Sequence, residues 1–234
     1  MPVLSRRDAV ITAMATAATP LVACAGSSPP PRLAALHRSL EHEAAGLGSD
    51  PRATVGRVQA LIAQAANDGA FEEWREHRPA GAEKVTLIGG GAPWRKWKVQ
   101  LFLIPAGSSH PPHCHENLAS CLVVVDGRLR VREYQRLREQ DASDSVVLAR
   151  AFDGELGPGE ALSTTEDYRN AHWFGAAATP VLAVNFKAVG HVRPELLRFR
   201  NRRYVDPSEA KAEVFRAPII DRASAHERFG RRSL

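Results

Sequence analysis

The chain has 234 residues, a net charge of +5 at pH 7 and three cysteines. This length suits one domain with a sizeable hydrophobic core. The cysteines lack the paired spacing of a zinc finger, which excludes that class of metal site.

Residues 1–23 have the features of an export signal. Arg6 and Arg7 form a charged start, and the Ala-rich run after them is too short and too weakly apolar to span a membrane. Residues 5–7 resemble the start of a twin-arginine motif, and residues 21–24 resemble a bacterial lipobox. These signals imply cleavage before Cys24, acylation of that cysteine, and anchoring to a bacterial membrane on its periplasmic face. The alternative is a buried apolar helix that happens to contain a cysteine.

Residues 24–32 are expected to form a Pro- and Ser-rich tether, and residues 33–80 a helical segment. The segment first shows leucines at helical spacing, at Leu33, Leu36 and Leu40. A second helix is expected to begin at Pro51 after an Asp50 cap and to end near residues 67–69. The histidines of this segment are expected at the surface: His37, His42 and His77.

From Lys84 the sequence changes to short β-branched runs separated by Gly, Pro and Asp clusters, a pattern typical of an all-β barrel or sandwich. The expected strands are residues 84–88, 97–104, 120–125, 128–134, 145–152, 160–165, 170–176 and 180–188. Residues 84–190 are therefore predicted to form one barrel, and residues 191–234 an irregular extension with a helix at 206–216. Basic residues at 198–203 indicate a solvated face or an anionic lipid surface, and no nucleic-acid partner is expected.

Three histidines lie in residues 106–127, which run into an apolar strand. His113 and His115 are separated by one residue, and residues i and i+2 of an extended strand point to the same face. Two imidazoles on one face can bind a single metal ion. His110 precedes two prolines that fix an extended conformation, so we expect it at the rim of the site.

The spacing in this stretch resembles the first motif of the cupins. Gly107, the His113–His115 triplet, position 120 and Gly127 fall at the intervals of that motif, with glycines at the tight turns. Cupins are double-stranded β-helices, jelly-roll barrels that hold a metal ion inside. The resemblance implies a mainly β fold, with the barrel preceded by a short helical segment and followed by the irregular extension. Cupins usually carry a metal-binding Glu where this chain has Ser120, so a carboxylate ligand is expected to be missing, with Glu116 as the alternative.

A narrower resemblance covers roughly residues 55–190. Asn170-Ala171-His172, followed by two aromatic residues, resembles the Asn-x-His segment of the thiol dioxygenases that oxidise cysteamine or N-terminal cysteines. That family also lacks the Glu and uses three histidines, and its His-x-His, Gly and Tyr fall at intervals matched here up to Tyr134. The resemblance implies a metal site formed by His113, His115 and His172, with Fe(II) as the expected metal and Zn, Mn or Ni as alternatives. The Pro-Pro-Tyr that usually follows the last strand of those enzymes has no counterpart here.

Such a site has a defined chemistry. Three neutral imidazoles leave a divalent ion with its full charge and open coordination positions, which favours an anionic ligand. A thiolate suits these positions because metal coordination lowers the pKa of a thiol. By resemblance, both atoms of O2 would be added to the sulfur of a small thiol to give a sulfinate. Four residues are candidates for orienting the substrate: Tyr134, Tyr168, Tyr204 and Arg169.

The remaining histidines, cysteines and tryptophans are expected outside the ligand set. Cys114 alternates with the ligands and Cys121 follows Ser120, so both thiols are expected to point away from the metal. Export would permit a disulfide between them, and two buried free thiols are the alternative. His191 and His226 are expected at the surface. The tryptophans at 94, 97 and 173 are expected to pack or to line a pocket.

Three classes of function fit these residues. The first is a non-haem iron oxidoreductase acting on a small thiol and O2, which the three-histidine pattern without Glu favours. The second is a non-redox metallocupin, in which Zn, Mn or Ni acts as a Lewis acid in hydrolysis, isomerisation or lyase chemistry. The third is a module that binds a ligand without turnover.

Overall fold

The computed structural model describes residues 31–72, 84–90, 96–190, 202–208 and 211–230. The expected export signal and most of the tether lie outside these ranges, as do His77, Trp94 and His191. Within the described ranges, no helix has both the length and the apolar character needed to cross a membrane.

Two antiparallel helices precede the strands, as the sequence predicts. Helix α1 (Pro31–Ala45) leads through a 3-10 turn, η1 (Gly46–Gly48), to α2 (Pro51–Asn67). The Asp50 side chain caps α2 by accepting a 3.0 Å hydrogen bond from the Ala53 amide. After α2, Gly69 adopts a φ of 71°, a left-handed conformation that suits glycine and stops the helix.

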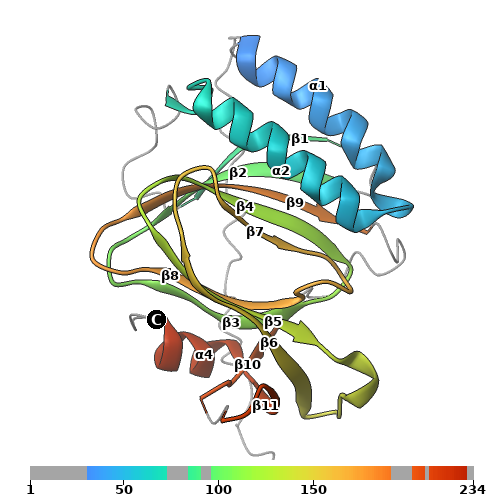
Figure 1. Cartoon of the computed structure of the whole chain (residues 1–234), viewed down its shortest axis with the longest axis vertical. Coiled ribbons are helices and arrows are strands. Elements are labelled where there is room, and N and C mark those ends of the chain that lie inside the picture. The colour runs from blue at the N-terminus through green and yellow to red at the C-terminus, as the bar shows by residue number, and fades with distance from the viewer. Residues whose placement is uncertain (1–30, 73–83, 91–95, 191–201, 209–210, 231–234) are drawn as a thin grey trace, which may run out of the picture.

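The strands form two antiparallel sheets that face each other (Figure 1). In spatial order, the first sheet contains β1 (Lys84–Gly90), β2 (Lys96–Ile104), β9 (Val181–Val189), β4 (Leu118–Asp126) and β7 (Ala161–Thr164). The second closes on itself in the order β10 (Arg202–Val205), β11 (Val214–Ile220), β6 (Ser145–Leu156), β5 (Leu129–Arg136), β8 (Ala171–Ala176) and β3 (Ser109–His115). The fold is thus a mainly β jelly roll, as predicted, and all eight expected strands are present.

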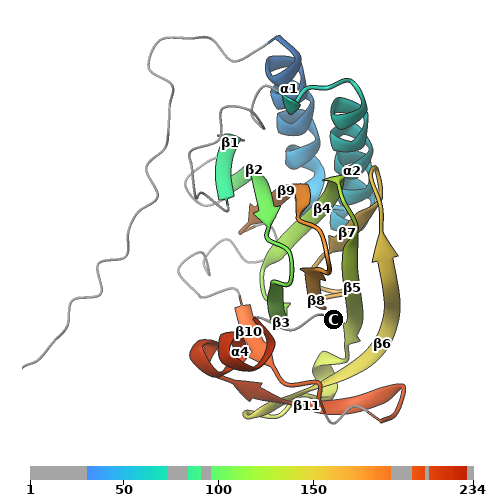
Figure 2. The same cartoon turned by 90° about the vertical axis from the view of Figure 1, so that its left-hand side faces the viewer.

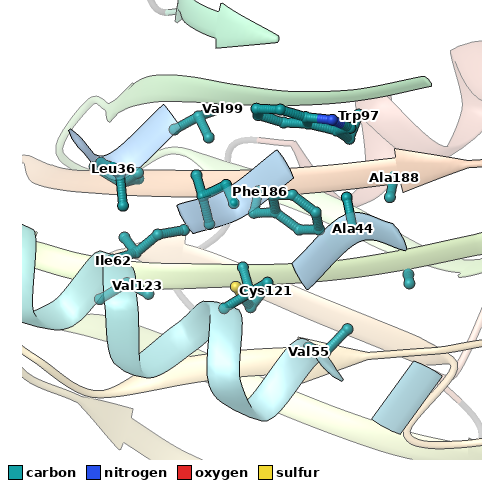
Figure 3. Close-up of a cluster of buried hydrophobic side chains, with 14 of the residues drawn as sticks. Leu36, Ala44, Val55, Ile62, Trp97, Val99, Cys121, Val123, Phe186 and Ala188 are labelled. Carbon is teal, nitrogen blue, oxygen red and sulfur yellow. The ribbon is translucent and has the colours of Figure 1, made fainter. Parts of the chain in front are cut away.

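Three apolar clusters hold the layers together. The largest lies between the two helices and the outer face of the first sheet, where Ile62 of α2 and Phe186 of β9 are both fully buried (Figure 3). A second cluster fills the space between the sheets around Leu129 and Val131. A third, around Val146 and Leu148 of β6, packs under the C-terminal strands. The alternation along β9 explains this arrangement, because successive side chains enter opposite clusters.

The C-terminal part differs from the irregular extension expected from the sequence. It contains β10 and β11, which belong to the second sheet, and helix α4 (Arg222–Phe229), which packs beside β3 and β10 (Figure 2). The helix predicted at 206–216 is wrong, because residues 214–216 belong to β11 and pair with β6. Strand β10 pairs with β3 and places Arg202 opposite His115.

Candidate metal centre

Strands β3 and β8 bring three histidines together inside the barrel. His113 and His172 are paired across these neighbouring strands, and His115 follows two residues after His113 on the same face. The side chains of all three residues are buried, with exposed fractions of 1%, 3% and 5% for His113, His115 and His172. The juxtaposition of His113, His115 and His172 is the one expected from the i, i+2 spacing and the Asn-x-His segment.

The ring nitrogens of these histidines converge. One nitrogen from each ring lies within 4.8 Å of the others, and His115 Nε2 is 3.2 Å from His172 Nε2. His113 Nδ1 is 2.7 Å from the carbonyl oxygen of Pro111, which can only accept, so Nδ1 carries the proton. The lone pair of His113 is therefore on Nε2, a buried atom with no hydrogen-bond partner in the described structure.

This arrangement fits a metal ion. Burial lowers the pKa of His113 well below its usual range and lowers the pKa of His172 to about 3, with the positive charge of Arg202 adding to both effects. Both imidazoles are thus neutral at physiological pH, which is the form that binds a metal. The bond from His113 to a backbone carbonyl is the usual outer contact of a metal-binding histidine. The group can therefore hold a divalent ion through three imidazole nitrogens.

Asn170 fixes the two histidine strands relative to each other. It is fully buried, and its Oδ1 accepts a 3.2 Å hydrogen bond from the His115 amide. Its Nδ2 donates to the carbonyl oxygens of Thr165 and Glu166. The Asn-x-His pattern thus has a structural role here, since Asn170 ties the loop before β8 to β3.

No carboxylate joins the three histidines in the described structure. Ser120 lines the cavity beside them and donates a 3.1 Å hydrogen bond to Asn185 Oδ1. Glu116, the alternative ligand, instead forms an ion pair with Arg203 at 2.8 Å. Neither Glu116 nor Arg203 is among the residues that line the cavity, so the Glu116 carboxylate is held away from the histidine nitrogens.

The histidines lie at one wall of a small cavity between the sheets, with a volume of about 30 Å³. Its other walls combine apolar side chains with polar and cationic ones: Phe102, Leu118, Leu122, Leu162, Phe174, Thr164, Asn185, Lys187 and Arg202. His110 also lines it, stacked on Phe174 with ring centroids 5.1 Å apart, and is not part of the group of three histidines. Burial, with Arg202 nearby, lowers the pKa of Lys187 to about 7.

Three of the four candidates for orienting a substrate lie away from the histidine cavity. Tyr134 packs edge-on against Phe215 in the third cluster and faces a separate cavity. Tyr168 lies under the guanidinium of Arg52, and Arg169 forms a 2.6 Å ion pair with Glu133. None of these three candidates lines the histidine cavity, since each is held by other contacts.

Tyr204 is the candidate nearest to the histidines. Its ring centroid is 5.9 Å from that of His113 and 5.8 Å from that of the exposed His226. Strand β10 creates this contact by pairing Tyr204 with His113. The sequence analysis did not identify Lys187 and Arg202 as cavity residues. For Lys187, the alternation of Asn185 and Lys187 along an otherwise apolar strand was a usable signal. For Arg202, the local sequence contained no such signal.

Both described cysteines are buried free thiols on the side away from the cavity. Cys114 belongs to the third cluster and Cys121 to the cluster under the helices. The predicted outward direction of both thiols is confirmed, and their different clusters explain why no disulfide joins them.

No protein-family model and no curated protein matches this sequence. Among solved structures, BH2720 from Bacillus halodurans is 21% identical with a TM-score of 0.36, over 50% of this chain and 77% of that chain. A Klebsiella pneumoniae protein with a double-stranded β-helix domain is 14% identical with a TM-score of 0.34, over 49% and 80%. Procruciferin, an 11S globulin from Brassica napus, is 20% identical with a TM-score of 0.32, over 40% of this chain and only 21% of that chain. At these scores the fold assignment depends on the strand pairings described above, which define a cupin-like jelly roll with a three-histidine group.

Proposed function

We propose that this protein is a non-haem Fe(II) dioxygenase that oxidises a small thiol to a sulfinate. The observation that supports it is the ligand set: three buried imidazoles with no carboxylate beside them among the described residues. A bound Fe(II) would supply a site for thiolate coordination and for electron transfer to O2. The reaction RSH + O2 → RSO2H balances without a further reductant, because the sulfur loses the four electrons that O2 gains.

The chain's own residues hold and shield this chemistry. His113, His115 and His172 would hold the metal, and the Pro111 carbonyl keeps the proton of His113 on Nδ1. Phe102, Leu122 and Phe174 line the cavity with apolar surface, which limits access of water to the reacting sulfur. Lys187 and Arg202, which also line the cavity, favour the thiolate over the neutral thiol.

The first test is the metal content of the full chain, combined with O2 uptake on a panel of small thiols. We expect about one iron per chain, thiol-dependent O2 uptake and one sulfinate per O2. His172→Ala should lose the metal and the uptake, whereas His42→Ala, which changes an exposed histidine of α1, should retain both. Zinc or nickel without O2 uptake would instead support the Lewis-acid or ligand-binding alternatives, and full metal retention in His172→Ala would contradict the site.

We also propose, from the sequence of residues 1–24 alone, that the protein is exported and anchored to the membrane through acylated Cys24. The buried thiols at 114 and 121 do not compete for this role, since both are fully enclosed by apolar clusters.

A further inference from the structure

One end of the histidine cavity is lined by positive charge. Lys187 and Arg202 both line the cavity, on β9 and β10 respectively. Lys187 alternates with the cluster residues Phe186 and Ala188, so its side chain projects to the inner face of the sheet. Arg202 is the cross-strand partner of His115 and lies on the same face as that histidine.

Two more lysines extend this cationic end across the first sheet. Lys98 of β2 is directly opposite Lys187 of β9, an arrangement that is destabilising for like charges. Lys84 of β1 is opposite Phe102, and its ammonium lies 4.7 Å from the centre of that ring, which lines the cavity. We call the four residues Lys84, Lys98, Lys187 and Arg202 the cationic wall.

Nothing in the described part of the chain neutralises the cationic wall. None of its four members forms an ion pair with a described carboxylate, and no Asp or Glu is among the residues that line the cavity. A divalent ion on three neutral histidines would add two more positive charges nearby. Lys187 and Arg202, the two members that line the cavity, are partly buried, and an anion that enters the cavity would offset the cost of holding their charges beside the metal.

We infer that the cavity, whose volume is about 30 Å³ in this structure, widens to bind a small thiol that carries a carboxylate, with the sulfur toward the three histidines and the carboxylate between Lys187 and Arg202. The assignment of the thiol group rests on the proposed function, and the assignment of the carboxylate rests on the cationic wall. The apolar side chains of Phe102, Leu122 and Phe174 also line the cavity and suit a short aliphatic chain. The cationic wall also disfavours thiols that carry an ammonium group.

The test compares three thiols of similar size that differ in charge: 3-mercaptopropionate, 2-mercaptoethanol and cysteamine. Their binding to the iron-loaded full chain is measured anaerobically by calorimetry, so that affinity is read without turnover. We expect the affinity to follow the order anion, neutral, cation, with about a tenfold step between successive thiols, the size of effect that one charge-assisted hydrogen bond produces.

Two variants locate the carboxylate. Lys187→Met and Arg202→Met should each weaken 3-mercaptopropionate binding about tenfold, weaken 2-mercaptoethanol binding by much less and retain the metal. Lys211→Met removes an exposed lysine and is the matched control. Equal affinities for the three thiols, or losses no larger than in Lys211→Met, would overturn the inference.

Sulfur-free anions separate this inference from the proposed function. If propionate binds with the same dependence on Lys187 and Arg202 but no thiol is oxidised, the carboxylate site stands and the thiol chemistry fails. If the thiols are oxidised with no preference for the anion, the dioxygenase stands and the carboxylate site fails. If inorganic phosphate bound to the cavity and neither 3-mercaptopropionate nor propionate did, the proposed carboxylate site would also be refuted.

Discussion

Among the described residues, Glu133 of β5 is a carboxylate that the second sheet buries beside a strand of the metal site. Its side chain is 3% exposed, and one of its oxygens accepts from Arg169 at 2.6 Å. It is the cross-strand partner of His172, and its second oxygen has no hydrogen-bond partner in the described structure. Burial raises the pKa of Glu133, and Arg169 opposes that rise. Arg169, expected from the sequence as a catalytic candidate, thus serves to neutralise a buried charge.

Removing Arg169 should therefore destabilise the fold. Arg169→Met leaves the Glu133 carboxylate buried without a countercharge, and we expect the free energy of unfolding to fall by about 2 kcal/mol, less than for a fully buried pair because the arginine is partly exposed. Urea denaturation measures this loss. The double variant Arg169→Met/Glu133→Met should recover most of it, and Arg132→Met, which breaks a more exposed pair, should cost under about 1 kcal/mol. A double variant as unstable as Arg169→Met would contradict the explanation.

At the scale of elements, helices α1 and α2 form a layer over the outer face of the first sheet (Figure 1). Val55, Val58 and Ile62 of α2 follow helical spacing and are all buried against that sheet. The helices do not contribute to the lining of the histidine cavity. Their role is to bury the outer face of the strands whose inner face carries Ser120, Asn185 and Lys187.

Ile62→Ala tests this packing. The side chain is fully buried, so its truncation should lower the free energy of unfolding by about 2–5 kcal/mol through lost burial and a residual cavity. Gln64→Ala, at an exposed position two residues later in α2, should change it by less than about 0.5 kcal/mol. Thermal or urea unfolding measures both. If the two variants were equally stable, the helices would not be packed as described.

The elements that the sequence predicted are those with local signals. The barrel strands alternate or carry β-branched runs, and the His-x-His spacing needs only the geometry of one strand. Residues 206–216 contain Glu, Ala and Lys, which favour helix, but pairing of Val214 and Phe215 with β6 overrides that weak preference. Arg202 could not be assigned to the cavity, because its position depends on a long-range pairing with β3.

At the scale of the whole molecule, all three histidines come from one sheet, through β3 and β8. A metal bound by them would cross-link two neighbouring strands that are far apart in the sequence. The metal would also give a bonding partner to buried nitrogens such as His113 Nε2, which lacks a hydrogen-bond partner in the described structure. Metal binding is therefore expected to stabilise the folded chain.

Removal of the metal should lower the melting temperature. At a free metal concentration 100 times the Kd, binding contributes about 2.7 kcal/mol, which corresponds to roughly 5–10 °C for a domain of this size. Calorimetry of the loaded protein and of the same protein after chelation measures the difference. The melting temperature of His172→Ala should not respond to added metal, and a response equal to that of the wild type would show that the metal binds elsewhere.

The pairing of β10 with β3 has a consequence for biosynthesis. Strand β3 carries two of the histidines, but β10, its partner on one side, follows β9 in the chain and leaves the ribosome after strands β1 to β9. Until then that edge of β3 has unpaired backbone groups and resembles the exposed edge strands that join other chains during aggregation. A nascent chain paused before residue 202 would thus have its histidine strand available to the wrong neighbour, and early contact with a chaperone would be most valuable during that interval.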